Sequence, residues 1–165
     1  MTVYHVATSG YISVEFRGWK GALDSLVETL ETGSRIERRE AIRALEIENL
    51  KLPQVDIPME HHYVNRMYWR ERPVKKGWVI TTKIHKEAGI TVILKGQLVF
   101  ITEEGWTRVT APAMFETHPG TKRVIFVEED AIFSTIHPNF EDSRDPDELE
   151  ARITAPDFDF LEVTP

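Results

Sequence analysis

Lys83 and His85 lie two positions apart in the segment WVITTKIH, which is rich in Val, Ile and Thr and is typical of a β-strand. Because side chains two apart on a strand point to the same face, we expect both to share one side of a sheet. A buried ammonium group is costly unless a negative charge meets it. The pattern therefore predicts that an anion contacts this pair.

Two sources of that anion are open. The first is internal: Glu71, Glu87 or Glu116 forms a buried ion-pair network, or Lys83 extends its ammonium group to the rim of the fold. The second is a bound ligand such as a phosphate, a nucleotide or a carboxylate. In that case this part of the chain is a binding site for a small anion.

A metal site is an alternative use of the histidines. Its ligands would be His85 with Glu116, His118 and His137, a set of imidazole and carboxylate groups that suits zinc, manganese, iron or nickel. Glu116 and His118 are two apart on an expected strand, so they can point the same way. Lys83 repels a cation. We therefore expect no metal cofactor, with a divalent metal as the alternative.

Several familiar catalytic patterns are absent from the sequence. It contains no Gly-rich phosphate loop, no Ser-His-Asp arrangement with a nucleophile elbow and no HExxH motif. The lack of cysteine excludes disulfides, thiolate metal sites and a cysteine nucleophile. The acidic groups at Glu103-Glu104 and at residues 128–130 fall at expected hairpin turns, where we interpret them as solvated charge. The sequence therefore favours binding over catalysis.

Length and charge narrow the class of protein. The chain has 165 residues, enough for one compact domain with a small appendage. Residues 1–140 hold 18 basic and 18 acidic side chains, whereas residues 141–165 hold two arginines and nine acids. A balanced body with an acidic tail argues against a nucleic-acid polymer as partner, because that partner needs a basic face. No segment has the apolar length of a membrane span and we see no secretion signal, so we expect a cytoplasmic protein without membrane contact.

Two helices are predicted before the strand-rich part of the chain. Residues 20–32 carry apolar side chains at helical spacing. Ser34 and Glu37 then form a capping-box pattern, and the helical spacing continues until Pro53. We expect this helical hairpin to cover one face of a sheet. Residues 1–19 look strand-like and are available for exchange between two copies of the chain.

From about residue 54 short runs rich in Val, Ile, Thr, Phe and Trp alternate with turn signals. Eight strands are expected, over residues 64–72, 78–85, 90–94, 97–102, 106–110, 113–117, 122–127 and 131–137. A short helix or strap is expected in the acidic tail. The sequence thus predicts a mainly β sandwich or barrel. Its parts are residues 1–53, the strand segment and hairpin; residues 54–140, the barrel; and residues 141–165, the tail.

The segment GWVITTKIHKEAGITVILKG resembles the first motif of the cupin superfamily, in which two strands supply three metal ligands. Three positions fall on the motif: Gly77, His85 and Gly96. Lys83 and Gly89 stand where the motif has a His and a Glu. In the second motif Gly120 matches the turn glycine, and Arg123 stands where the last metal-binding His belongs. The resemblance implies a cupin-like double-stranded β-helix.

Residues 58–156 are also similar to a group of uncharacterised cupin-like proteins encoded by tailed bacteriophages. The matching segments are Tyr68-Trp69-Arg70-Glu71, Ile84-His85-Lys86, Pro119-Gly120-Thr121-Lys122-Arg123 and Thr135-Ile136-His137. The chain departs from the group at Ala88 and Gly89, where the group carries an acidic residue and a second His. This likeness implies a fold and a phage origin, but no particular reaction.

Together these resemblances imply a ligand site inside the barrel. Its expected residues are Lys83, His85, Arg123, Lys122, Tyr68 and Arg70. We expect a phage-encoded, small-molecule-binding homodimer in the cytoplasm of an infected bacterium, holding an anionic, nucleotide-like ligand and sequestering a host signalling molecule. Two alternatives are a metal-dependent cupin enzyme (isomerase, lyase or oxygenase) and a virion-associated or host-interaction structural protein.

Overall fold

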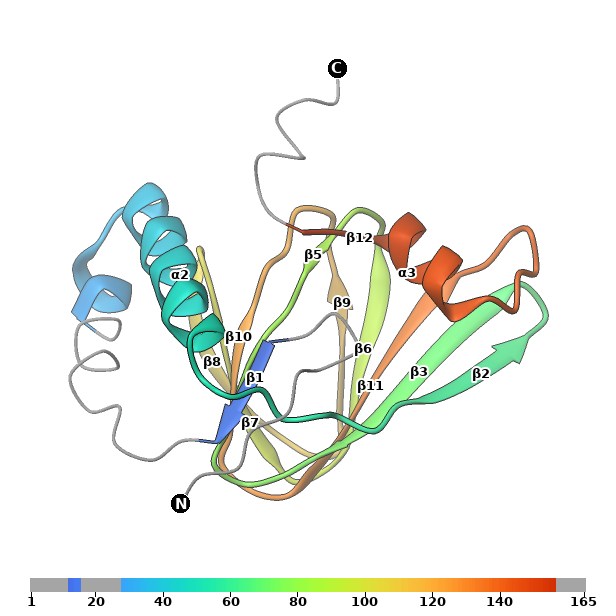
Figure 1. Cartoon of the computed structure of the whole chain (residues 1–165), viewed down its shortest axis with the longest axis horizontal. Coiled ribbons are helices and arrows are strands. Elements are labelled where there is room, and N and C mark those ends of the chain that lie inside the picture. Colours follow the sequence, from blue (N-terminus) through green and yellow to red (C-terminus); the bar gives the residue numbers. More distant parts are fainter. Residues whose placement is uncertain (1–11, 16–27, 157–165) are drawn as a thin grey trace.

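The computed structural model describes residues 12–15 and 28–156, which form two five-stranded antiparallel sheets packed face to face (Figure 1). The first sheet has the order β1-β4-β10-β7-β8 and the second the order β2-β3-β11-β6-β9. The strands are β1 Ile12–Glu15, β2 Glu60–Val64, β3 Met67–Val74, β4 Trp78–Thr81, β5 Ile84–His85, β6 Gly89–Lys95, β7 Gln97–Thr102, β8 Gly105–Thr110, β9 Ala113–Thr117, β10 Val124–Val127, β11 Ala131–Pro138 and β12 Thr154–Ala155.

The chain passes repeatedly from one sheet to the other, so neighbouring strands within a sheet are often distant in sequence. Strand β10 pairs with β4 and β7, whereas β11 pairs with β3 and β6. This order confirms the expected double-stranded β-helix. The expected strand 78–85 is divided, because β4 ends before the short β5 begins. Strand β2 is additional to the expected strands, and the turn at Asn65 and Arg66, both with positive φ, separates it from β3.

Helix α2, Arg35–Leu50, covers the outer face of the first sheet, as expected for the second helix of the hairpin (Figure 1). Its capping box is formed by Ser34 and Glu37, which confirms the sequence signature. Residues 28–32 of the first helix are helical, and the rest of that prediction lies outside the described residues, as does most of segment 1–19. The interface buries side chains from both helices and the sheet: Leu30, Ile42, Leu45, Val79, Ile101 and Val124.

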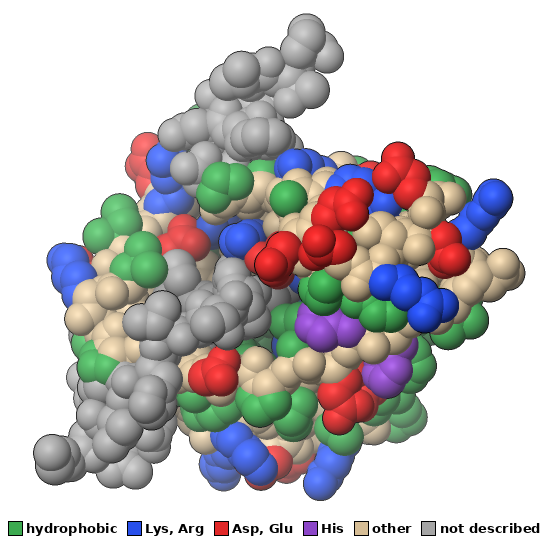
Figure 2. Space-filling model, turned by 45° about the vertical axis from the view of Figure 1, so that its right-hand side comes forward, with side chains coloured by type: hydrophobic (Ala, Val, Ile, Leu, Met, Phe, Trp, Pro, Cys, Tyr) green, Lys and Arg blue, Asp and Glu red, His purple; other side chains and the backbone are tan. Residues whose placement is uncertain are grey.

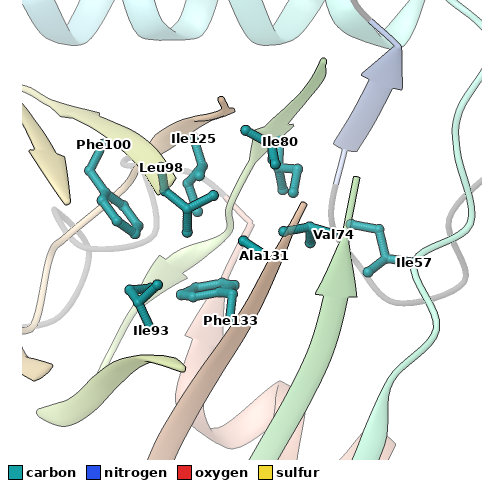
Figure 3. Close-up of a cluster of buried hydrophobic side chains, with 10 residues drawn as sticks. Ile57, Val74, Ile80, Ile93, Leu98, Phe100, Ile125, Ala131 and Phe133 are labelled. Atoms are coloured by element: carbon teal, nitrogen blue, oxygen red, sulfur yellow. The ribbon is translucent and has the colours of Figure 1, made fainter. Parts of the chain in front are cut away.

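The space between the sheets has an apolar half and a polar half. The apolar half joins side chains of both sheets, among them Ile80, Ile93, Leu98, Ile125 and Phe133 (Figure 3). Burying these groups removes apolar surface from water, which is the main driving force for closing the sandwich. The polar half lies beyond this cluster along the same strands, and it contains the candidate site.

The acidic tail contains α3, Pro146–Ile153, which confirms the expected short helix. The Asp145 side chain caps its first turn, and β12 directly after it pairs with β5. Leu149 and Ile153 pack on Tyr68, so α3 lies against strand β3. Acidic side chains gather on the upper part of the face shown in Figure 2. None of the helices in the described part of the chain has the length and apolar character needed to cross a membrane.

Candidate functional site

Strand β3 supplies the first wall of the polar half. Its burial alternates, so that Tyr68, Arg70 and Arg72 point inward and are fully buried. The register places His137 of β11 opposite Tyr68, and Thr135 opposite Arg70. The Arg72 guanidinium donates to the Thr135 hydroxyl at 3.4 Å. Two permanent positive charges, carried by residues two positions apart on one strand, therefore lie inside the barrel.

Arg123 brings a third guanidinium group from the opposite sheet. It precedes β10, is 4% exposed and donates to the hydroxyls of Thr91 at 3.3 Å and Thr117 at 2.8 Å. Its guanidinium carbon lies 5.6 Å from the ring centre of Phe115 and 5.8 Å from that of Phe100. Aromatic faces attract a guanidinium group in this distance range. Neutral hydroxyls and aromatic rings thus contact the Arg123 guanidinium group and hold it in place.

A pair of histidines lies between these arginines. The rings of His85 and His137 stack with centres 5.4 Å apart and an interplanar angle of 19°. Burial, followed by the charges of Arg123 and Arg70, lowers the pKa of His85 to about 3. Burial and the charge of Arg70 also hold the pKa of His137 well below its ordinary value. Both rings are therefore neutral at pH 7, mainly because they are buried, and the charges of the nearby arginines act in the same direction.

The position of the missing cupin carboxylate is closed by packing. A Cβ atom on Gly89 would lie 2.8 Å from the carbonyl oxygen of Ile136 and 3.0 Å from Nδ1 of His137. A glutamate side chain at this position therefore requires β6 and β11 to move apart. The close approach of the two strands explains why the chain has glycine here.

The four residues named as alternative metal ligands do not converge. His85 and His137 are together in the interior, whereas the side chains of Glu116 and His118 are 81% and 73% exposed at the surface. Their alternation is the reason: Phe115 and Thr117 of β9 point inward, so Glu116 between them points outward. Across the described ranges, 12–15 and 28–156, no three His, Cys, Asp or Glu side chains are grouped to hold a metal ion.

The internal partner of the predicted lysine is Glu150 of α3, which is not among the three glutamates expected. One Glu150 oxygen lies 2.6 Å from the Lys83 ammonium nitrogen, and the other lies 3.4 Å from Nη1 of Arg70. Lys83 is about one third exposed, so it lies at the rim rather than inside. Glu71 instead accepts a hydrogen bond from Ser134. Only the return of α3 onto the barrel brings Glu150 to these cations.

A pocket of about 570 Å³ opens at the side of the polar half, between the β8 and β9 edges of the two sheets. Phe100, Phe115 and Arg123 form part of its lining, and these three also belong to the interior. Trp106 and Arg35 of α2 contribute from outside the barrel. The pocket thus connects solvent with the Arg123 guanidinium group.

Lys122 and Glu103 attach α2 to this rim. The Lys122 ammonium group is buried and lies 2.7 Å from a carboxylate oxygen of Glu46 in α2. Glu103 is 8% exposed and accepts from Arg39 and Arg35, which corrects our interpretation of it as solvated charge. Burial alone would raise the pKa of Glu103, but the hydrogen bonds from Arg39 and Arg35 outweigh it and lower the pKa.

The structure thus divides the expected ligand-binding residues. Tyr68, Arg70, His85 and Arg123 come together in the interior, Lys83 lies at the rim, and Lys122 is engaged by α2. Sequence reasoning missed Arg72, although its two-residue spacing from Arg70 on a predicted strand is a usable signal. It also missed the threonines that hold Arg123, for which the sequence carries no distinguishing pattern.

Comparison with known proteins finds similar proteins among solved structures only. No family model matches the chain, and no curated protein matches it. A cupin-2 domain protein from Shewanella frigidimarina aligns at 12% identity with a TM-score of 0.44, over 56% of this chain and 90% of that one. A cupin-like protein from Thermotoga maritima aligns at 8% identity and 0.45, over 53% and 71%.

An acetylacetone dioxygenase from Acinetobacter johnsonii aligns at 15% identity with a TM-score of 0.41, over 50% of this chain and 59% of that one. Likeness at these values carries no argument about ligand or reaction. The fold assignment rests on the strand order, and the function must be argued from the site itself.

Proposed function

We propose that this protein binds a small anion in the polar half of its barrel. The observation that carries the proposal is the burial of three guanidinium groups, those of Arg70, Arg72 and Arg123, around the stacked histidine pair. Burial is the main cause of the lowered pKa of His85, and the charges of these three arginines lower it further. A negatively charged ligand placed among these guanidinium groups gains charge-assisted hydrogen bonds in a region shielded from water.

Access from solvent to Arg123 supports the same proposal. The rim pocket has a volume of about 570 Å³, which lies within the usual range for small-molecule sites of roughly 300–1,000 Å³. Arg123 is reached from this pocket and also acts electrostatically on His85. An anion that enters at the rim therefore meets Arg123 first.

A nucleotide-like ligand is the finer form of the proposal. Phe115 and the half-exposed Trp106 line the pocket and offer aromatic surfaces for a base, while Arg123 offers a planar fork for phosphate oxygens. Sequestering a host signalling nucleotide during phage infection is the biological use we propose for such binding. The phage origin itself stays a prediction from the sequence resemblance.

Replacing Arg123 tests this proposal. We expect Arg123→Gln to weaken binding of phosphate, AMP or a cyclic mononucleotide about tenfold or more, because a charge-assisted contact inside the barrel is lost. Isothermal titration calorimetry of the full chain measures the effect. Arg108→Gln is the matched control, since Arg108 pairs with Glu128 on the exposed outer side of the sandwich.

Native mass spectrometry of protein purified without chelator separates the alternatives. A retained anion that is lost in Arg123→Gln supports the proposal. Stoichiometric metal without an anion contradicts it and favours a cupin enzyme. A wild-type chain that binds none of the anions, with a thermal melting curve unchanged by them, also contradicts it and favours a structural role.

We also propose that the outer face of the second sheet forms a homodimer contact. Five large apolar side chains of its strands are exposed: Val64, Met67, Ile90, Leu94 and Met114. Exposed apolar side chains gathered on one face of a sheet are typical of an interaction surface. We expect light scattering after size exclusion to give the mass of a dimer, and Met114→Glu, at 70% exposure, to shift it to the monomer. A wild-type monomer would contradict the proposal.

A further inference from the structure

The buried histidine His137 has hydrogen-bonding groups that the described protein does not satisfy. Its side chain is about 1% exposed, and neither Nδ1 nor Nε2 has a hydrogen-bond partner within residues 12–15 and 28–156. Nδ1 of the neighbouring His85 is in the same condition. Buried polar atoms in folded proteins are nearly always hydrogen-bonded to protein, ligand or water, so something outside these residues must meet this pair.

The chemistry of the imidazole specifies what that partner must offer. A neutral ring has one N–H donor and one nitrogen lone pair. Burial, followed by the charge of Arg70, holds the pKa of His137 well below its ordinary value, so the ring is neutral at pH 7 and does not donate from both nitrogens. Because both of its nitrogens are unsatisfied, His137 needs one acceptor and one donor at the same time.

Nearby side-chain hydroxyls have other contacts. The Tyr68 hydroxyl, opposite His137 in the register, lies 2.6 Å from Nδ1 of His61. The Thr135 hydroxyl accepts from Arg72. On the third side Gly89 packs its backbone against the ring and has no side chain to offer.

A bare oxyanion fulfils only part of these requirements. When it is fully deprotonated, as a carboxylate or sulfate is at pH 7, its oxygens accept from arginines and from an imidazole N–H, but it has nothing to donate to the imidazole lone pair. A hydroxyl group supplies that donor. We infer that the ligand is a hydroxylated organic anion, such as a sugar phosphate or a hydroxycarboxylate, whose charged oxygens contact the arginines and whose hydroxyl donates to His137.

This inference rests on the proposed function and adds the identity of a second recognised group. The ribose hydroxyls of a nucleotide satisfy it as well as the hydroxyls of a simple sugar phosphate. The inference is therefore that one ligand molecule carries both a negative charge, which contacts the arginines, and a neighbouring hydroxyl group, which donates to the neutral His137.

Two probes of similar size test the hydroxyl requirement on the full chain. Glycerol 3-phosphate and n-propyl phosphate carry the same phosphate and the same number of carbons, and they differ by two hydroxyl groups. We expect glycerol 3-phosphate to bind about tenfold or more tightly by calorimetry, because its analogue leaves the imidazole lone pair unsatisfied. L-Malate and succinate form the corresponding pair of carboxylates.

The variant His137→Phe keeps a ring in the same place and removes both nitrogens. We expect it to bind the two phosphates equally, at the wild-type affinity for n-propyl phosphate. His118→Phe, changed at the exposed surface, is the matched control and keeps the preference. Nitrogen-15 NMR of the wild-type imidazoles gives a readout that needs no variant: the unprotonated His137 nitrogen should shift with glycerol 3-phosphate and not with its analogue.

The outcomes separate the two levels of the argument. Equal binding of both members of each pair by the wild type overturns the hydroxyl requirement and leaves anion binding intact, as expected if water alone completes the imidazole. Preference that persists in His137→Phe overturns the role of His137. Failure of every anion to bind overturns the proposed function itself.

Discussion

Lowering the pH from 7 to about 5 is expected to destabilise the fold by about 2 kcal/mol through the buried His85, and further in the same direction through the buried His137. The folded state holds His85 at a pKa of about 3 and His137 well below the ordinary value of 6.5. In the unfolded chain both rings titrate near 6.5. At pH 5 the His85 ring is thus protonated only in the unfolded state, which stabilises that state by about 2 kcal/mol, and the lowered pKa of His137 acts in the same direction.

The direction of the effect follows from proton binding. Between about pH 3 and 6.5 the unfolded chain binds more protons than the folded one, so the free energy of unfolding decreases as the pH falls through this window. Above this pH window His85 and His137 are neutral in both states and contribute no pH dependence to the free energy of unfolding. Half-buried His61 adds in the same direction, because burial and then Arg70 lower its pKa. Glu103, with its lowered pKa, loses stabilising charge only below about pH 4.5.

Urea unfolding at the two pH values measures the effect. His137→Phe should reduce the pH-dependent loss to about half, because one ring still titrates only in the unfolded state. His118→Gln, at an exposed position, should leave the loss unchanged. A wild-type unfolding free energy that is equal at pH 7 and 5 would show that the pair is charged or solvated in the folded protein.

Replacing Gly77 or Gly96 by alanine is expected to give the second large effect, a loss in the free energy of unfolding that differs between the two positions. Both glycines have φ of +85°, where a side chain costs about 1–2 kcal/mol. A Cβ atom on Gly77 meets nothing within 4 Å, whereas one on Gly96 lies 2.4 Å from the carbonyl oxygen of Asp130 and 2.7 Å from Ala131. The two substitutions therefore share the backbone strain and differ in steric surroundings.

We expect Gly77→Ala to reduce the free energy of unfolding by about 1 kcal/mol. Gly96→Ala should reduce it by about 3 kcal/mol more than Gly77→Ala does, because backbone atoms at the β6–β7 turn must move to make room for the new methyl group. Chemical denaturation monitored by tryptophan fluorescence gives both values. Equal losses would mean that the turn relaxes without cost. A larger loss for Gly96→Ala would show that a side chain is tolerated less well at Gly96 than at Gly77.

Sequence periodicity predicted most of the fold because it depends on local physics. The capping box at Ser34, the positions of most strands and the helix in the acidic tail follow from side-chain types over a few residues. The double-stranded β-helix came from motif resemblance. Strand β2 was missed because it is short and rich in polar residues, and its hairpin turn uses Asn65 and Arg66 in place of glycine.

Alternation along one strand was sufficient to predict that some of the candidate residues are buried. That His85 is inside and that Arg70 accompanies Tyr68 follow from strand geometry and motif position. The exposure of Glu116 follows from the same alternation, because Phe115 and Thr117 on either side of it point inward. Which set of alternate residues points inward is seen only in the folded sheet.

The sequence by itself determined the mainly β architecture, and it places Lys83, Gly89 and Arg123 where the cupin motifs that it resembles have metal ligands. Only the tertiary structure decided which carboxylate contacts Lys83, which histidines pair and which of their nitrogens need a partner. The physical reason is distance in sequence. Glu150 lies 67 residues from Lys83, and contacts across such separations depend on how layers pack, which local side-chain patterns do not encode.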